Sequence, residues 1–353
     1  MAGAAGRSEA AGQPPFGEAI ITIADLGEFG LIAAIGRLLP GSADLIVGIG
    51  DDAAVVRAPD SRVVATTDML IEGRHFRREW SAPRDIGHKA AARNLADIAA
   101  MGARPTALLV AFAAPGETDV DWVLELMAGI ARECSAAGAS VAGGDTSSAD
   151  RIILAVTALG DLAGQPPVTR SGARPGDVVA VTGALGSAAA GLALLSAGMA
   201  APDRRFDADL AALVGAHRRP DPPYRAGPQA VSLGATSMID VSDGLVADLG
   251  HVAAASGVRI ELRSEVLAAE PLARASALAR ARALLDQSYA QPGPSWQQWV
   301  LTGGDDHALA ATFPADISLP ENWTIAGKVV QGNGVGIDGH DWGEQGGWEH
   351  FRS

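Results

Sequence analysis

Short apolar runs of this chain repeatedly end at aspartate, often with glycine beside it. These runs have the length and residue types of buried strands, and they read LIVGIG, VVATT, SVAGG, SMI and VLTGG. The aspartates that follow them are Asp51, Asp52, Asp68, Asp145, Asp240, Asp305 and Asp306. A single aspartate in such a place usually ends a strand or starts a turn. Repetition within one chain indicates a set of strand ends that bring carboxylates to a common site.

Helical segments alternate with these runs and place the chain in the α/β class. Residues 82–105 predict a helix that ends near Gly102, and residues 119–138 predict one closed by Gly138. Further strands are expected at 106–115, 139–145 and 151–161. Because several strands are adjacent in sequence, an α+β arrangement fits the pattern as well as a doubly wound sheet does.

The length of 353 residues is too great for one ordinary core and predicts two domains. Residues 163–177 are rich in Pro, Gly and Arg and form the best linker candidate, so the boundary is placed near residue 164. We therefore expect a disordered N-terminal extension (1–25), an N-terminal domain (26–163) and a C-terminal domain (164–353).

Residues 178–202 carry no charge over a length that could span a bilayer. Several glycines and serines interrupt the stretch, which favours a buried strand at 178–183 followed by a helix that stops at Gly198. A strand at 236–240 and a helix at 245–257 come next, and Asp240 or Ser242 is placed to cap that helix.

Charge and cysteine content narrow the class of protein. The net charge of −14 argues against nucleic acid or an anionic membrane as a partner, although metal ions would still allow phosphates to bind. The N-terminus lacks the apolar stretch of a signal peptide. The only cysteine, Cys134, permits no internal disulfide and is expected to be a small buried apolar residue in a reducing cytoplasm.

Asp97 differs from the other aspartates because it lies inside an apolar helical run. A carboxylate there is costly unless it is paired or bound to a cation. Basic partners are few, since the chain has only two lysines, Lys89 and Lys328. Lys89 follows Asp85 by four residues, so we expect a surface pair on the helix rather than a site residue. If the carboxylates converge they need cations, and carboxylate and hydroxyl oxygens, including those of Thr66 and Thr67, suit Mg²⁺.

Several common site motifs are absent. The only Gly-Lys pair, Gly327-Lys328, is followed by valine, so the chain has no P-loop. No protein-kinase HRD or DFG, no HExxH and no CxxC zinc pattern occurs. The GIG at residues 48–50 lacks a third glycine and precedes two aspartates, which would repel a pyrophosphate unless metal were present.

Taken in order, the motifs resemble one known family. GIGDDAAVV, TTDML followed by His75, NLADIAAMGARP, GGDT, RSGARPGD, IDVSDGL, GGDD and the closing GGWEHF follow the order found in thiamine-monophosphate kinases. These enzymes belong to the superfamily of aminoimidazole ribonucleotide synthetase and selenophosphate synthetase. The resemblance covers roughly residues 26–312 and returns at 346–351. It is carried by the set in order, and the IDVSDGL form is its most telling member.

The resemblance implies a two-domain fold like that of aminoimidazole ribonucleotide synthetase, with an ATP- and Mg²⁺-binding N-terminal domain that forms a homodimer. It implies transfer of the γ-phosphoryl group of ATP to thiamine monophosphate with several Mg²⁺ ions, in the cytoplasm. The positions that match metal ligands are Asp52, Thr66, Thr67, Asp68, Asp97, Asp145, Asp240 and Asp243. Those that match ATP-site residues are Gly144, Asp145, Arg170 and Ser242, and those that match the thiamine monophosphate site are His75, Asp305 and Trp348.

One motif departs from the family pattern. Where the family commonly has GGEDYEL, this chain has GGDDHAL, so Asp305, His307 and Ala308 replace other residues. The shorter carboxylate at 305 is expected to shift the acceptor or to require a bridging water, without changing the reaction. Two rivals stay open: a related ATP-using enzyme with another acceptor, and a non-catalytic homologue that binds nucleotide or metal. No side chain is assigned as general base, since the acceptor phosphate is already largely ionised near neutral pH.

Overall fold

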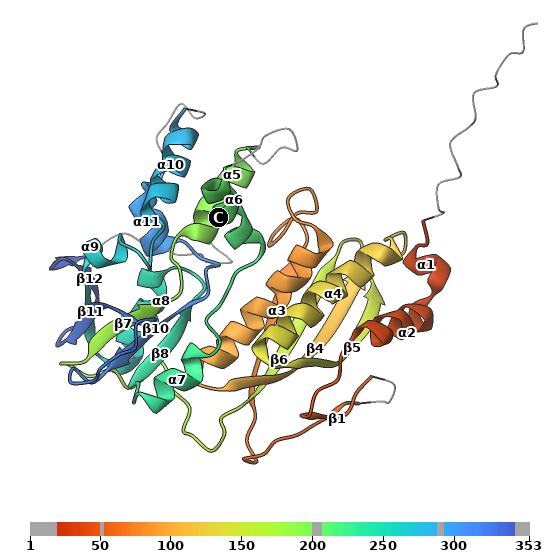
Figure 1. Cartoon of the computed structure of the whole chain (residues 1–353), viewed down its shortest axis with the longest axis horizontal. Coiled ribbons are helices and arrows are strands. Elements are labelled where there is room, and N and C mark those ends of the chain that lie inside the picture. The colour runs from red at the N-terminus through yellow and green to blue at the C-terminus, as the bar shows by residue number, and fades with distance from the viewer. Residues whose placement is uncertain (1–19, 50–52, 200–206, 288–292, 343–353) are drawn as a thin grey trace, which may run out of the picture.

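The structure is a computed structural model that describes residues 20–49, 53–199, 207–287 and 293–342. Two units lie side by side, and each is built around its own sheet (Figure 1). The unit drawn from red to yellow holds the N-terminal part of the chain, and the green and blue unit holds the C-terminal part. A mixed α/β fold in two parts was predicted, and this arrangement confirms it.

The N-terminal sheet has four strands and is covered by helices on one face. The strand order is β3 (Val64–Ile71), β6 (Ile153–Asp161), β4 (Arg104–Ala114) and β5 (Ser140–Ser148). β6 is antiparallel to both of its neighbours, and β4 is parallel to β5. The covering helices are α3 (Pro83–Ala100) and α4 (Val120–Ala137). Gly102, with φ +76°, and Gly138, with φ +79°, follow these helices as the sequence predicted.

Helices α3 and α4 pack with their backbones in close approach. A Cβ atom on Gly87 would lie 1.9 Å from the carbonyl oxygen of Leu126, and one on Gly129 would lie 2.2 Å from that of Arg84. Only glycine fits at these two positions, because any side chain would force the helices apart. The contact fixes α3 against α4, beside it on the same face of the sheet.

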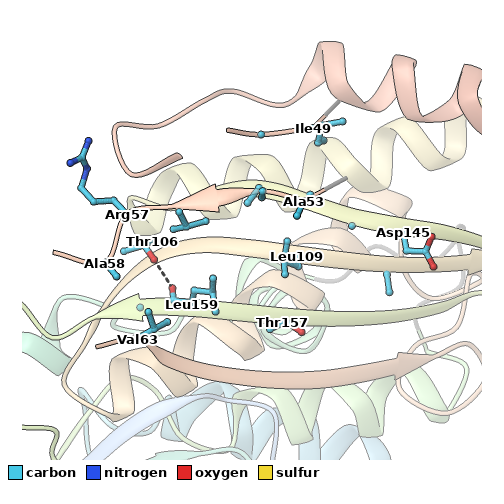
Figure 2. Close-up of a pocket in the computed structure, with 18 of the residues that line it drawn as sticks. Ile49, Ala53, Arg57, Ala58, Val63, Thr106, Leu109, Asp145, Thr157 and Leu159 are labelled. Atoms are coloured by element: carbon cyan, nitrogen blue, oxygen red, sulfur yellow. Dashed lines mark hydrogen bonds between the residues drawn. The ribbon is translucent and has the colours of Figure 1, made fainter. Parts of the chain in front are cut away.

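The other face of the N-terminal sheet is not covered by helices. Helix α1 (Ile23–Leu26) is bonded to the loop before α4. Helix α2 (Glu28–Leu38) and the small ribbon of β1 (Leu45–Val47) and β2 (Val55–Val56) lie beside the open face. A hollow of about 1030 Å³ opens there, and Figure 2 shows Thr106, Leu109 and Thr157 on the strands that form its floor. Its wall includes exposed apolar side chains: Phe29 (82% exposed), Val63 (52%), Ile49 (40%) and Leu109 (37%).

The C-terminal sheet has seven strands. Their order is β13 (His340–Asp341), β12 (Gly334–Ile337), β9 (Arg259–Leu262), β11 (Thr324–Val330), β7 (Val178–Thr182), β10 (Ala308–Phe313) and β8 (Ser237–Val241). Of these pairs only β9 with β12 is parallel. Within the described residues neither sheet is doubly wound, so the α+β alternative describes the topology.

Seven helices of the described chain belong to the C-terminal unit. They are α5 (Ser187–Ser196), α6 (Ala208–Arg218), α7 (Ala226–Ser232), α8 (Leu245–Ser256), α9 (Ser264–Leu267), α10 (Ala275–Asp286) and α11 (Trp296–Thr302). The uncharged stretch that begins at residue 178 therefore forms β7 and α5, as predicted. Among the described residues, no helix is long and apolar enough to cross a membrane. Cys134 is buried in the N-terminal core, and burial raises the pKa of its thiol to about 12.

The two units meet along the C-terminal end of α3. Ala99 and Ala100 share an apolar cluster with Ala226 and Ala230 of α7 and with residues of β8 and β10. A Cβ on Gly227 would lie 2.1 Å from the carbonyl oxygen of Ala99, so α7 touches the backbone of α3. Helix α3 thus belongs to the N-terminal core along its length and reaches the C-terminal sheet at its end.

Candidate active site

A group of carboxylates lies where α3 of the N-terminal unit meets β8 of the C-terminal unit. The Oγ1 of Thr66 donates a 2.7 Å hydrogen bond to Asp97. Burial raises the pKa of Asp97 to about 7, and the negative charges of Asp240 and Asp68 act in the same direction. Carboxylates from β3, α3 and β8 are therefore close enough to repel one another, although they come from distant parts of the chain.

Neighbouring threonines of β3 point to opposite faces of the sheet. Thr66 and Asp68 face α3, because the backbone N–H of Asp68 donates to Asn94 of that helix and Thr66 reaches Asp97. Thr67 lies on the exposed face, where its hydroxyl donates to the carbonyl of Val156. The period of two in a strand separates these two predicted metal ligands.

The turn after β8 is held by Asp248. Its Oδ2 accepts hydrogen bonds of 3.1 Å from the backbone N–H groups of Asp243 and Gly244. Burial, together with the charges of Asp240 and Asp243, raises the pKa of Asp248 to about 7. Of the three aspartates between residues 240 and 248, Asp248 thus organises the turn. Asp240 and Asp243 are left for the candidate site.

The prediction that Asp240 or Ser242 caps helix α8 is wrong. The N-cap residue is Gly244, with φ +122° and no side-chain cap. Strand β8 continues through Asp240 to Val241, so the chain must turn sharply before the helix starts. A Cβ on Gly244 would lie 2.7 Å from the backbone of Thr302, which explains why glycine occupies the turn.

His307 was not predicted as a site residue, yet it contacts one. Its Nδ1 lies 3.1 Å from Oδ2 of Asp240, and both side chains are buried. In the part of the chain that the structure describes, its Nε2 is buried and has no hydrogen-bond partner. The departure from the family motif at this position was the only signal in the sequence.

Two cations hold Asp305. The Nζ of Lys89 lies 2.9 Å from Oδ2 of Asp305, and Nη1 of Arg93 lies 3.1 Å from Oδ1. Burial alone would raise the pKa of Asp305, but the charges of Lys89 and Arg93 outweigh it and hold that pKa well below the usual range. Asp305 also adopts φ +66°, a left-handed conformation that its contacts must maintain.

The prediction that Lys89 forms a surface pair with Asp85 is wrong. Lys89 is only 2% exposed and turns toward the C-terminal unit, whereas Asp85 pairs with Arg219 at 3.4 Å. Spacing of four residues along a helix does not tell which face is buried, and here the face of Lys89 lies against the site.

Asp306 has a structural role despite its place in the GGDD motif. Its carboxylate accepts hydrogen bonds from the backbone N–H groups of Gly186 (2.5 Å) and Ala188 (2.8 Å). These are donors that the first turn of α5 leaves without helical partners, so Asp306 caps that helix from a distant part of the sequence. Burial raises the pKa of Asp306 to about 7, and the two backbone donors act against that rise.

A pocket of about 320 Å³ lies between the two units beside these groups. It brings together four predicted residues: His75, Ser242, Asp243 and Asp305. Apolar walls come from Trp80 and Leu192, and Arg93 lines the same space. The Nδ1 of His75 accepts a 3.0 Å hydrogen bond from the backbone N–H of Ile71, which orients the ring. The volume of the pocket and its mixed lining suit a small molecule that carries both charge and apolar surface.

Other predicted residues lie apart from this pocket. Gly144 and Asp145 are on β5 and face the open hollow of the N-terminal sheet, where Figure 2 shows Asp145 at one end. A Cβ on Gly144 would lie 1.9 Å from the carbonyl oxygen of Val110, so the neighbouring strand already demands glycine there. Arg170 is exposed in the segment between the domains. Asp52 and Trp348 lie outside the described residues.

Comparison with known proteins identifies the family to which the chain belongs. Residues 50–162 match the model of the AIR synthase related protein, N-terminal domain. A thiamine-monophosphate kinase of Mycobacterium tuberculosis is 46% identical over 331 residues, covering 94% of this chain and 93% of that protein. The chain belongs to the thiamine-monophosphate kinase family.

Solved structures agree with this membership. Thiamine monophosphate kinase from Aquifex aeolicus has a TM-score of 0.71 and 33% identity, covering 90% of this chain and 98% of that one. A structure of AaThiL complexed with AMPPCP and TMP has a TM-score of 0.72 and 34% identity, with coverage of 93% and 98%.

Proposed function

We propose that this chain transfers the γ-phosphoryl group of ATP to thiamine monophosphate, which yields ADP and thiamine diphosphate. The observation that carries the proposal is the pocket between the two units, where Asp243, Asp305 and Ser242 lie beside the carboxylates of Asp97 and Asp240. The family supports it, since the related AaThiL was solved with AMPPCP and TMP, an ATP analogue and the proposed acceptor.

The carboxylates suit bound Mg²⁺. In the described ranges no three histidine, cysteine or acidic side chains stand close enough to form a ready-made ion site. However, burial and the negative charges of Asp240 and Asp68 raise the pKa of Asp97, and a bound cation would relieve that repulsion. Hard oxygen donors of this kind prefer Mg²⁺, and Asp52, Thr66 and Asp243 are assigned to the same ligand set. Thr67 and Asp145 were predicted with them, but they face the other side of the N-terminal sheet. Bound Mg²⁺ would neutralise charge on the phosphates as the phosphoryl group moves.

The chain's own residues have distinct parts in this proposal. Ser242 and Arg170, together with Gly144 and Asp145, are assigned to ATP. His75, Asp305 and Trp348 are assigned to thiamine monophosphate, and the flat ring of Trp348 suits a cationic thiazolium. Because phosphoryl transfer depends mainly on position and charge, no covalent intermediate on the protein is required.

The uncovered face of the N-terminal sheet supports a homodimer as part of the same proposal. Exposed Phe29, Val63 and Leu109 stand together there, and a second copy of this chain would bury them. The N-terminal domain at 26–163 is accordingly assigned to ATP, Mg²⁺ and dimer formation. The predicted disordered extension at 1–25 is wrong at its end, because residues 23–25 belong to helix α1, and residues 1–19 lie outside the described residues. The C-terminal domain is assigned to residues 164–353. The proposed location is the cytoplasm, where the co-substrate ATP is found.

An end-point assay tests the reaction. The purified protein is mixed with ATP, MgCl₂ and thiamine monophosphate, and the products are separated by chromatography. We expect ADP and thiamine diphosphate in equal amounts, and neither when EDTA is present. Parallel reactions with thiamine or with no acceptor test the choice of acceptor. ATP that stays intact, or ADP formed without thiamine diphosphate, would reject the proposed reaction and favour another acceptor or a non-catalytic role.

A further inference from the structure

Arg93 is a charged residue of the pocket that lies outside every motif of the sequence. It stands on α3 one turn after Lys89 and one turn before Asp97. Its side chain is 14% exposed, with Nε 3.4 Å from Asp68 and Nη1 3.1 Å from Asp305. In the described part of the chain, the hydrogen bonds of Arg93 come from Nε and Nη1. The guanidinium therefore lines a ligand-sized pocket with donors to spare.

Asp305 does not depend on Arg93 for neutralisation. Its second cation, Lys89, is 2% exposed, and an unpaired ammonium at that depth would be costly. Lys89 is therefore committed to Asp305. Arg93 lines the pocket and is the cation of the two that a ligand can reach.

The contact of Arg93 with Asp68, at 3.4 Å, is longer than its contact with Asp305, at 3.1 Å. Asp68 also belongs to the proposed Mg²⁺ ligand set, so a bound cation would compete with Arg93 for that carboxylate. In the absence of metal, the charges of Asp305, Asp68 and Asp97 all act on Arg93. Mg²⁺ bound by Asp68 and Asp97 would neutralise part of this negative charge, and an anion would then be attracted to Arg93.

We infer that Arg93 binds the phosphate of the acceptor and selects phosphorylated thiamine over thiamine itself. The inference rests on the proposed function and adds a specificity residue to it. A guanidinium presents parallel N–H donors that match two oxygens of one phosphate. Arg93 acts by binding and orienting that phosphate, which places it in line for the incoming phosphoryl group.

Comparison of two ligands that differ only by the phosphate isolates this contact. Dissociation constants for thiamine monophosphate and thiamine are measured by calorimetry in the presence of MgCl₂ and AMPPCP. The ratio of the two constants reports the contribution of the phosphate. In Arg93→Gln we expect that ratio to fall roughly tenfold or more, the loss expected from one charge-assisted contact, with thiamine binding unchanged. Arg93→Lys, which keeps the charge and loses the fork, should give an intermediate ratio.

Arg78→Gln is the matched control. Arg78 lies over the ring of Trp122 at 5.0 Å and does not line the pocket, so its loss should leave the ratio unchanged. An unchanged ratio in Arg93→Gln would overturn the inference, and so would an equal loss for both ligands, which would mean that Arg93 only shapes the pocket. If Arg93→Gln fails to fold, Arg93→Lys carries the test. Turnover by the wild-type protein is measured separately. Failure of the proposed reaction can therefore be distinguished from the absence of a contact between Arg93 and the phosphate.

Discussion

The imidazole of His307, which directly precedes strand β10, supports the carboxylate of Asp240 on the neighbouring strand β8. Nδ1 and Oδ2 are 3.1 Å apart, and the backbone N–H of His307 donates to the carbonyl of Val241. His307 is 1% exposed and has φ +52°, so its position is set by its surroundings rather than by its own preference. A buried carboxylate that repels Asp97 is thus fixed in one orientation by a histidine.

Replacing His307 should weaken metal binding. His307→Ala removes the group that orients Asp240, and loss of such a supporting contact typically lowers metal affinity or activity by about 10- to 100-fold. Titration with Mn²⁺, followed by the loss of the free-ion electron paramagnetic resonance signal, gives the affinity directly. His340 is exposed, and His340→Ala serves as the control. Equal Mn²⁺ affinity in His307→Ala and the wild-type protein would remove the supporting role.

Asp97→Asn should separate activity from stability. The pKa of Asp97 is raised from 3.8 to about 7, so the ionised carboxylate destabilises the metal-free fold. Because the folded pKa is above the unfolded one, this destabilisation grows between about pH 4 and pH 7 and is complete above pH 7. In EDTA at pH 8 the variant should be more stable than the wild-type protein by on the order of 1 kcal/mol, and the gain should vanish near pH 4.

Turnover by Asp97→Asn should fall, although its stability in EDTA rises. Loss of a proposed metal ligand should lower kcat of Asp97→Asn by roughly 100-fold or more at saturating Mg²⁺. Thermal unfolding at pH 4 and pH 8, with EDTA or with MgCl₂, measures the stability side. A variant with wild-type turnover would exclude Asp97 as a ligand. A variant less stable than the wild-type protein in EDTA at pH 8 would contradict the charge argument.

Asp306→Ala should destabilise the fold through helix α5. The substitution leaves the backbone N–H groups of Gly186 and Ala188 buried without their acceptor. We expect a loss of about 1–3 kcal/mol in the free energy of unfolding, measured by urea titration. Asp306→Asn keeps one carbonyl acceptor of the same shape and should lose less. If the two variants were equally stable, the capping role would be ruled out.

Gly87→Ala should separate the helices of the N-terminal unit. The added Cβ would lie 1.9 Å from the carbonyl oxygen of Leu126, so α3 must shift, at a cost of about 1–3 kcal/mol or more. Since α3 carries Lys89, Arg93 and Asp97, kcat should fall together with stability. Gly250→Ala is the control, because no atom lies within 4 Å of its added Cβ and alanine favours the interior of helix α8. Wild-type stability in Gly87→Ala would contradict the close approach.

Local patterns in the sequence predicted the elements well. Turn and cap chemistry placed the ends of α3 and α4, because Gly102 and Gly138 adopt the positive φ that such ends favour. The alternation of side chains along a strand also predicts that Thr66 and Thr67 point to opposite faces of the sheet, although both were assigned to metal. These features depend on neighbours within one element.

Contacts between distant elements could not be predicted from pattern. The pair of Lys89 with Asp305 spans 216 positions, and the cap from Asp306 to Ala188 spans 118. No periodicity encodes such a pairing, so Lys89 was assigned to the surface and Asp306 received no role of its own. His307 was visible only as a departure from a family motif, and nothing in that departure indicated its contact with Asp240.

Helix α3 fixes the spacing of the site along one direction. Lys89, Arg93 and Asp97 recur every four residues on one face, so at 1.5 Å per residue the first and last are about 12 Å apart along the axis. Any opening or closing of the two units can change how far these residues stand from Ser242 or Asp305, but not how far they stand from one another. An acceptor of different length would therefore have to fit a fixed distance between Lys89 and Asp97, which movement of the two units cannot change.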